Sequence, residues 1–195
     1  MTNYNALPYT NLTSGSTYRR PPQRLPDRVR AESPATDVLT DFNKVAALTI
    51  GPCATIEQAN QRMISSGVRL LLVTDQYNAI MGIITATDIS GEKPLKYLKE
   101  VGGKREDIFV RDIMTAQEKL EVLYMVDVEN AKVGDVVETM KRVGRQHALV
   151  IDLDDNRHHI VRGIFSTKQI SKQLGITIEP TEVARTFAEL EAALA

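Results

Sequence analysis

The chain has 195 residues, of which 43% are apolar and 25% are charged, and its formal net charge at pH 7 is −1. This composition is ordinary for a soluble globular protein of one or two small domains. No apolar run approaches the ~18 residues that a membrane span needs, and the start lacks the blocks of a signal peptide. We therefore expect a cytoplasmic protein with no membrane partner. The single cysteine, Cys53, excludes an intrachain disulfide and a CxxC metal site.

The first 34 residues are rich in proline and arginine. They hold five of the eight prolines and five arginines against two acids, whereas the rest of the chain has a net charge of −4. Because they lack a periodic apolar pattern, they predict an extended or disordered arm that lies over the folded body. Arginine side chains pair with phosphates, so contact with nucleic acid or an acidic partner is the alternative.

Residues 54–89 predict a helix, two strands and the start of another helix. Thr55 and Gln58 have the spacing of a capping box, and Gly67 is placed where the helix ends. Two short apolar runs joined by polar turn residues follow the helix, and they predict strands at 70–73 and 80–85.

Residues 131–170 repeat this order of elements. The offset is 77 residues up to Asp152, which aligns with Asp75, and 81 residues from Gly163 onward. The four extra residues are therefore expected at a hairpin tip in the polar stretch 153–159. One such unit leaves a face of its sheet open, so we expect two lobes that pack together around a shared cleft.

A matching lead-in precedes each lobe, at 36–40 and at 111–115. These lead-ins, the strand Gly-x-Arg-x-x-x-Val-x-Asp at 67–75 and the ending Gly-Ile-Ile-Thr-Ala-Thr-Asp at 82–88 resemble a CBS domain, the module named after cystathionine beta-synthase. The two copies together resemble a CBS pair, or Bateman module, spanning roughly 36–175. The resemblance implies an α/β fold in which two β-α-β-β-α modules pack sheet to sheet with pseudo-two-fold symmetry.

The expected organisation has four parts. They are an extended basic arm at 1–34, a first CBS module with a long connector at 35–107, a second CBS module at 108–175, and a C-terminal amphipathic helix at 176–195. The connector is predicted to be an exposed helix and loop with solvated lysines, and contact with a phosphate or a partner is the alternative. The apolar stripe of the last helix must be covered by its own body or by a second chain. The resemblance implies a homodimer, which favours the second chain.

The resemblance also implies regulatory binding of AMP, ADP or ATP in the cleft. An aspartate that opens a helix after a strand can accept hydrogen bonds from ribose hydroxyls, and Thr85 adds a hydroxyl near Asp88. The same spacing fits an ordinary helix cap. His147 is expected to stay protonated if it faces a phosphate, and otherwise to be an ordinary strand residue. Carried over from the family, the first site comprises Thr85, Ala86, Thr87, Asp88, Met114, Thr115, Arg145, Gln146, His147, Ala148 and Leu149.

A mirror-image site is implied in the other half of the cleft. It comprises Thr40, Arg69, Leu70, Leu71, Leu72, Ser166 and Gln169. Gln169 stands where the family has aspartate, and a neutral amide loses the charge-assisted bonds to ribose. We therefore expect one good nucleotide site in each chain and one weak or empty site.

The sequence lacks the motifs of a catalytic site. It contains no phosphate loop, no nucleophile elbow and no metal-binding pattern, so we expect no catalytic residues, no metal and no required cofactor. The predicted function is regulatory: the chain senses an adenine nucleotide and signals to a protein target. The alternative is an interaction or nucleic-acid-associated adaptor that uses the arginine arm while the clefts stay empty.

Overall fold

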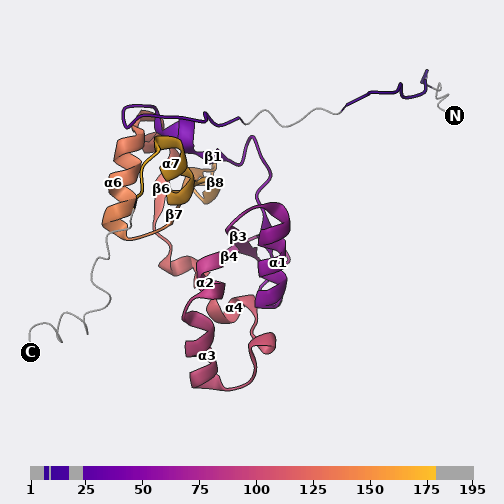
Figure 1. Ribbon diagram of the computed structural model, residues 1–195, viewed down its shortest axis with the longest axis vertical. Helices are drawn as coiled ribbons and strands as arrows, with labels where there is room; N and C mark the ends of the chain where they lie inside the picture. The colour runs from indigo at the N-terminus through magenta and orange to yellow at the C-terminus, as the bar shows by residue number, and fades with distance from the viewer. Residues whose placement is uncertain (1–6, 9, 18–23, 179–195) are drawn as a thin grey trace, which may run out of the picture.

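The computed structural model describes residues 7–8, 10–17 and 24–178. Residues 24–178 form two lobes around two four-stranded sheets, and residues 7–8 and 10–17 belong to a segment that extends away from them (Figure 1). The first lobe contains β2 (Thr49–Ile50), α1 (Ile56–Ser66), β3 (Leu70–Thr74), β4 (Ile80–Thr85) and α2 (Ala86–Ser90). The second contains β6 (Val122–Tyr124), α5 (Met125–Asn130), α6 (Val133–Val143), β7 (His147–Leu153), β8 (His159–Ser166) and α7 (Thr167–Leu174). The predicted α/β fold with its β-α-β-β-α order is confirmed, with two consecutive helices in the second lobe.

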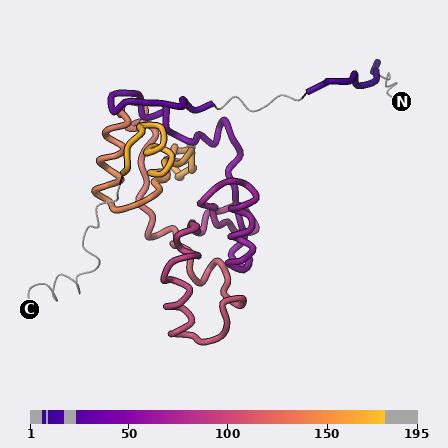
Figure 2. The backbone as a smooth tube through the Cα atoms, in the orientation of Figure 1, coloured from indigo at the N-terminus to yellow at the C-terminus, as the bar shows by residue number. Residues whose placement is uncertain are grey.

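Short elements precede and connect the lobes. They are the 3-10 helix η1 (Ala35–Val38), β1 (Thr40–Asp41), α3 (Lys93–Val101), η2 (Arg105–Asp107), α4 (Val110–Ile113), β5 (Thr115–Ala116) and η3 (Gln117–Lys119). The connector helix α3 extends away from the sheets at the far end of the first lobe (Figure 2). No helix within the described ranges is long and apolar enough to cross a membrane.

The ends of the long helices follow the capping signals of the sequence. Thr55 Oγ1 accepts a hydrogen bond from the backbone N–H of Gln58 at 3.2 Å, and the Gln58 side chain accepts one from the Thr55 N–H at 2.9 Å. Gly67 ends α1 and Gly144 ends α6, both with φ 67° in the left-handed region that glycine tolerates best. The predicted capping box and helix stop at Gly67 are confirmed.

The lead-ins are exchanged between the two lobes. β1, which precedes the first lobe in the chain, pairs antiparallel with β8 of the second lobe, and β5 pairs with β4 of the first. The 3-10 helix η1 also packs in the second lobe, where Ala35 and Val38 are fully buried. The predicted boundary between the two modules, between residues 107 and 108, divides the chain in sequence order. Each sheet, however, contains one strand from the other side of this boundary.

Two aligned glycines lie where the exchanged strands cross. A Cβ on Gly163 would lie 2.5 Å from the Thr40 carbonyl oxygen, and a Cβ on Gly82 would collide with the Thr115 carbonyl oxygen. Only glycine permits such a close approach of two backbones. The repeated glycine and the repeated lead-in threonine thus occur together because they touch across the lobes.

The two hairpins have the same turn. In each, an aspartate Oδ1, of Asp75 or of Asp154, accepts hydrogen bonds of 2.7–2.9 Å from the backbone N–H groups two and four residues further on. The alignment of Asp75 with Asp152 and the insertion at the tip, both predicted from the sequence, are therefore wrong. Each strand of the second hairpin is instead two residues longer than its equivalent in the first. Adding the same even number of residues to both antiparallel strands keeps their pairing and keeps each side chain on the same face of the sheet. Asp152 instead binds Arg162 Nη1 at 2.9 Å.

The core has a layer on the helix side of each sheet and a third layer between the sheets. Strand side chains alternate in direction, so Leu71 packs against the helices of the first lobe whereas Leu72 faces the other sheet. Leu149 of β7 and Ile83 of β4 meet Leu72 in this middle layer. The sheet-to-sheet packing of the two modules is confirmed, and the cleft borders this layer.

The end of the N-terminal arm lies on the second lobe (Figure 2). The Val29 N–H donates to the Gln173 carbonyl oxygen at 3.0 Å, and the Gly134 N–H donates to the Ala31 carbonyl oxygen at 2.8 Å. Arg19 and Arg20 lie outside the described residues, as does the predicted C-terminal helix from residue 179 onward. Contact of the arm with nucleic acid stays a prediction.

Candidate functional site

Asp88, the aspartate expected to bind ribose, is part of a helix cap. Its Oδ2 accepts hydrogen bonds from the Thr85 backbone N–H at 2.8 Å and from Thr85 Oγ1 at 2.7 Å. The Asp88 N–H donates in return to Thr85 Oγ1 at 3.1 Å. This is the reciprocal arrangement of a capping box, and it fixes the start of α2. One carboxylate oxygen is thus fully used by the fold.

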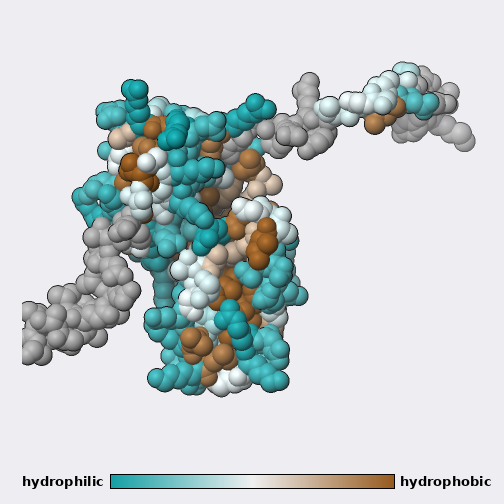
Figure 3. Space-filling model, in the orientation of Figure 1, coloured by the Kyte–Doolittle hydropathy of each residue, from teal (hydrophilic) through white to brown (hydrophobic). Residues whose placement is uncertain are grey.

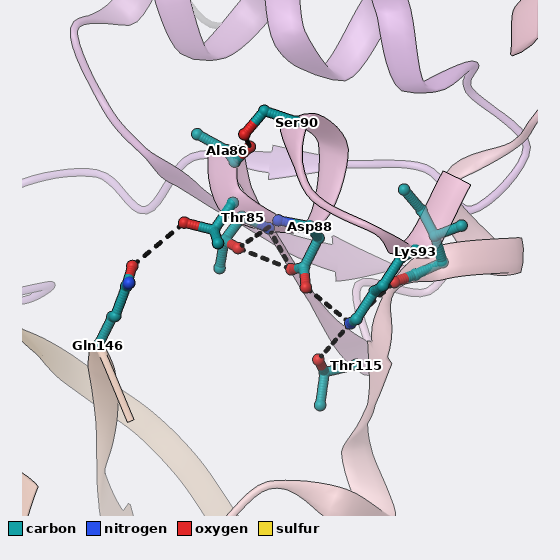
Figure 4. Close-up of polar contacts among 9 residues, drawn as sticks. Thr85, Ala86, Asp88, Ser90, Lys93, Thr115 and Gln146 are labelled. Carbon is teal, nitrogen blue, oxygen red and sulfur yellow. Dashed lines mark hydrogen bonds and ion pairs between the residues drawn. The ribbon is translucent and has the colours of Figure 1, made fainter. Parts of the chain in front are cut away.

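The other carboxylate oxygen is held by Lys93 (Figure 4). Lys93 Nζ lies 2.6 Å from Asp88 Oδ1 and also donates to the Ile113 carbonyl oxygen at 3.1 Å and to Thr115 Oγ1 at 3.2 Å. The connector prediction of solvated lysines is wrong for Lys93, because Asp88 and the second lead-in supply a partner for each of its N–H groups. Lys96 instead makes a surface pair with Glu92 at 2.9 Å.

The remaining residues of the first predicted site point in several directions. Thr87 Oγ1 donates to Gln146 Oε1 across the lobes at 3.2 Å (Figure 4). Arg145 turns away from the cleft and binds Glu121 Oε2 at 3.0 Å and the Lys119 carbonyl oxygen at 3.1 Å. Four other residues of this predicted site pack in the cores. Ala86 and Met114 lie on the helix side of the first sheet, Ala148 lies on the helix side of the second, and Leu149 lies between the sheets.

The residues of the second predicted site line a cavity of about 660 Å³ at the junction of the lobes. Only Leu71 is turned away, because its neighbours in the strand face the other sheet. The predicted residues that line it are Thr40, Arg69, Leu70, Leu72, Ser166 and Gln169.

This cavity is apolar inside and basic at one end. Further lining residues that the sequence reasoning missed include the apolar Phe42, Val45, Leu48, Met63 and Ile164, and the basic Lys168 and Lys172. None of the described residues that line it is acidic. A second cavity of about 530 Å³ adjoins it and shares Arg69, His147, Ser166, Lys168 and Lys172. The basic side chains therefore lie where the two cavities meet.

In the second lobe, Gln169 aligns with Asp88, and its side chain pairs with Gln173. Gln169 Nε2 donates to Gln173 Oε1 at 3.4 Å, and Gln173 Nε2 donates to the Pro26 carbonyl oxygen at 2.7 Å and the Asp37 carbonyl oxygen at 3.3 Å. The Gln173 side chain therefore connects α7 to the first lead-in by hydrogen bonds, and the Lys93 side chain connects the connector to the second lead-in in a similar way. Because Gln173 is only 5% exposed, this tie is part of the core.

His147 lies between the two predicted sites. It was assigned to the Asp88 site, yet its side chain lines both cavities on the Gln169 side. Burial, followed by the nearby positive charge of Arg69, lowers the pKa of His147 to about 4, and the opposing effect of Asp88 is smaller. His147 is therefore neutral at pH 7 in the unliganded chain. Strand side chains alternate in direction, so His147 points to the same side of the sheet as Leu149. This alternation is the sequence signal that could have indicated the direction of the His147 side chain.

The comparisons with known proteins agree with this architecture. Residues 40–93 match the family model of the CBS domain. An uncharacterized conserved protein from Pyrococcus horikoshii is 22% identical over 73% of this chain and 92% of its own, with a TM-score of 0.51. The CBS-domain containing protein ATU1752 from Agrobacterium tumefaciens is 21% identical over 65% and 87%, with a TM-score of 0.48. The comparison with curated proteins gave no match.

A CBS domain pair solved with ligands is also similar. It belongs to protein MJ0100, in complex with 5′-methylthioadenosine and S-adenosyl-L-methionine, and is 23% identical over 72% of this chain and 94% of its own, with a TM-score of 0.49. The family match covers most of the first lobe, and the second lobe repeats the order and sheet topology of the first. Residues 40–93 are therefore a CBS domain, and the chain has the fold of a tandem pair of such modules.

Proposed function

We propose that the chain is a regulatory protein that binds an adenine nucleotide in the cavity around Leu70, Ile164 and Ser166, and signals its presence to a protein partner. The observation that carries the proposal is the cavity itself, which combines an apolar interior with a basic end. Its volume of about 660 Å³ is within the range of small-molecule and cofactor sites.

The apolar interior suits a purine base. Leu70 and Leu72 of β3 and Ile164 of β8 line the cavity, so a flat ring can bury apolar area against aliphatic side chains. Ser166 shows no side-chain hydrogen bond to the N-terminus of α7, so its hydroxyl is free of a capping role there. It can serve a ribose hydroxyl as donor or acceptor.

The basic end suits phosphates. Arg69, Lys168 and Lys172 contribute three cationic groups, and Lys168 lies in the first turn of α7, where the helix dipole also favours anions. Without an acidic lining residue, this arrangement creates a positive field that favours a ligand with several negative charges. We therefore infer that ATP binds more tightly than AMP.

Signalling follows from the cavity's position between the lobes. Its lining residues come from both sheets, so a ligand there favours the relative orientation of the lobes in which both sets of contacts are made. Apolar patches lie on the surface of the first lobe (Figure 3), and the exposed Leu95 and Val101 of α3 offer a surface there for a partner or for a second copy of the chain.

Titration calorimetry with ATP, ADP, AMP and adenosine tests the proposal. We expect one equivalent of nucleotide for each wild-type chain and no measurable binding to Ser166→Phe, whose ring would fill the cavity. Ser65→Phe makes the same change on the exposed surface of α1 and should bind as the wild type does. Absence of binding to the wild type, or unchanged binding to a folded Ser166→Phe, would contradict the proposal.

A further inference from the structure

We propose that residues 179–195, called the C-terminal segment below, dock over the basic end of the cavity and are displaced by the phosphates of a bound nucleotide. The inference rests on the proposed function, because it assigns a regulator to the same site. The occupant of this surface is a segment of the same chain, and not a second copy or another protein.

The basic end of the cavity carries positive charge without a nearby acid. Arg69, Lys168 and Lys172 line both cavities, and none of the described residues that line them is acidic. Among the residues that the structure describes, none forms an ion pair with these three side chains. Lys168 and Lys172 are exposed and lie four residues apart on α7, so they are neighbours on one face of the helix. This face therefore suits an acidic segment as well as phosphates.

The chain leaves the second lobe beside these two lysines. Gly175 ends α7 with φ 71°, and the chain turns back so that the Ile178 N–H donates to Ser171 Oγ at 3.2 Å. Ser171 lies between Lys168 and Lys172 in the sequence of α7, and it lines the smaller cavity. Ile178 lines the same cavity and is buried in the core of the second lobe, which fixes the exit point of the chain. The C-terminal segment therefore starts next to the basic end.

The sequence of the C-terminal segment complements this surface. It contains four glutamates against one arginine, which gives a net charge of −3. Its large apolar residues recur at helical spacing, and they are Val183, Phe187, Leu190 and Leu194. On a helix, Glu182 and Glu191 would flank this apolar stripe, whereas Arg185 would lie on the opposite face. A helix that lays the stripe on the protein therefore brings carboxylates, and not the arginine, towards the surface.

Two exposed isoleucines in the cavity linings suit the apolar stripe. Ile176 lines the smaller cavity, and Ile64 of α1 lines the larger one. A helix over residues 181–194 would be about 21 Å long, which exceeds the diameter of a sphere with the volume of both cavities together. The C-terminal segment is therefore long enough to extend from its exit point over both cavities. Because its glutamates and the phosphates of a nucleotide compete for the same cations, a bound nucleotide releases the apolar stripe to a partner.

Zero-length carbodiimide crosslinking, read by mass spectrometry, tests the docking without a ligand. The reagent joins a carboxylate to an amine that it contacts, so we expect Glu191 to crosslink with Lys168 or Lys172. Lys96, an exposed lysine of α3, should not react with Glu191. A mixture of isotopically heavy and light chains shows by mass whether a crosslink lies within one chain, as we expect. Saturating ATP should remove the crosslink, whereas adenosine, which has no phosphate, should leave it.

Titration calorimetry tests the competition with phosphates. The Glu182→Gln/Glu191→Gln double variant should bind ATP about two- to fivefold more tightly than the wild type, since exposed ion pairs are weak, and should bind adenosine equally. The Glu118→Gln/Glu129→Gln double variant removes the same charge at exposed positions outside the cavity linings and should keep wild-type affinity. Thermal unfolding of each variant checks that it is folded.

The outcomes separate the docked segment from the proposed cavity site. Absence of the crosslink, or a crosslink only between chains, would overturn the docking and leave the cavity site standing where ATP binds. A crosslink that persists with bound ATP, or equal ATP affinities of the two double variants, would overturn the displacement by phosphates. A crosslink within one chain, in a protein that binds no ATP as wild type or as double variant, would support the docking and remove the proposed nucleotide site.

Discussion

Asp88 Oδ1 and Lys93 Nζ lie 2.6 Å apart, and this ion pair has no equivalent at the aligned position of the second lobe, where Gln169 replaces the aspartate. The neutral side chain of Gln169 pairs instead with Gln173 of the same helix at 3.4 Å. The Asp88 carboxylate is therefore paired with groups of the protein itself. On the side of Gln169, where this aspartate is missing, the chain has an apolar cavity with a basic end.

Replacing Asp88 should affect stability more than nucleotide binding. Asp88→Ala removes the reciprocal cap with Thr85 and leaves the Lys93 ammonium without its carboxylate, so we expect the free energy of unfolding to fall by about 1–3 kcal/mol. Nucleotide affinity should stay within about twofold of wild type, because a change of ~0.4 kcal/mol or less is expected for a residue outside the cavity. Urea denaturation and calorimetry measure the two quantities. Glu138→Ala, at the exposed pair with Arg142, is the control and should change neither.

The glycine at the strand crossing should not tolerate a side chain. In Gly163→Ala the new Cβ would lie 2.5 Å from the Thr40 carbonyl oxygen, so β1 must move away from β8. We expect a loss of stability of about 1–3 kcal/mol, as for other overpacked sites, measured by urea denaturation. Gly51→Ala is the matched control, since a Cβ there meets nothing within 4 Å. Equal stabilities of the two variants would mean that the exchanged strand does not cross at Gly163.

The acid stability of the chain should depend on Asp41. Arg162 donates to Asp41 Oδ1 at 2.8 Å and to Oδ2 at 3.3 Å, and this hydrogen bonding holds the pKa of Asp41 below its ordinary value of 3.8. A carboxyl whose folded-state pKa is depressed stabilises the fold above its unfolded-state value and loses that contribution as the pH falls through the folded-state pKa. Unfolding free energies measured from pH 6 to pH 2 should therefore fall more steeply below about 4 in the wild type than in Asp41→Asn.

His147 should report on ligand binding. Its pKa of about 4 in the unliganded chain lies below the ordinary 6.5, so the unfolded chain takes up this proton first. The stability contribution of neutral His147 should therefore be lost as the pH falls from about 6.5 to about 4. Phosphates near the ring favour its protonated form, so saturating ATP should raise the midpoint of its NMR titration, whereas adenosine should not. An unchanged midpoint with bound ATP would exclude phosphate contact with His147.

The phosphate series should follow the charges of the basic end. We expect affinity to rise in the order adenosine, AMP, ADP, ATP, and the Lys168→Ala and Lys172→Ala variants to lose about tenfold or less for ATP, about 1.4 kcal/mol, with little change for adenosine. Arg142→Ala, on the exposed face of α6, removes a cation far from the cavity lining and should keep wild-type affinity. Equal effects of the variants on adenosine and ATP would show that these lysines act through the fold.

Much of the fold could be predicted because short sequence patterns indicate its helices, strands and turns. Helical spacing before Gly67, a capping box at Thr55 and the repeated order of elements are short-range features that the tertiary structure did not override. The alignment of Asp75 with Asp152 was wrong because the sequence does not show where the four extra residues of the second hairpin lie. They are divided equally between its two strands, so the turn aspartate that matches Asp75 is Asp154. The exchange of the lead-in strands was not predicted, because strand partners far apart in sequence leave no local signature.

The candidate site was harder to predict than the fold. The sequence could show that Asp88 has the spacing of both a cap and a ribose ligand, but not that Lys93, five residues later, would reach its free oxygen. The cavity end at Lys168 and Lys172 depends on where α7 docks against the first sheet, which is a long-range contact.

A crystal structure of the chain grown with ATP tests the central claim most directly. We predict electron density for one nucleotide between the sheets, with the adenine against Leu72 and Ile164, the ribose at Ser166 and the phosphates at Lys168 and Lys172, while Lys93 remains bound to Asp88. Density for the nucleotide at Asp88 with the Ser166 cavity empty, or no nucleotide in either position at saturating ATP, would contradict the account.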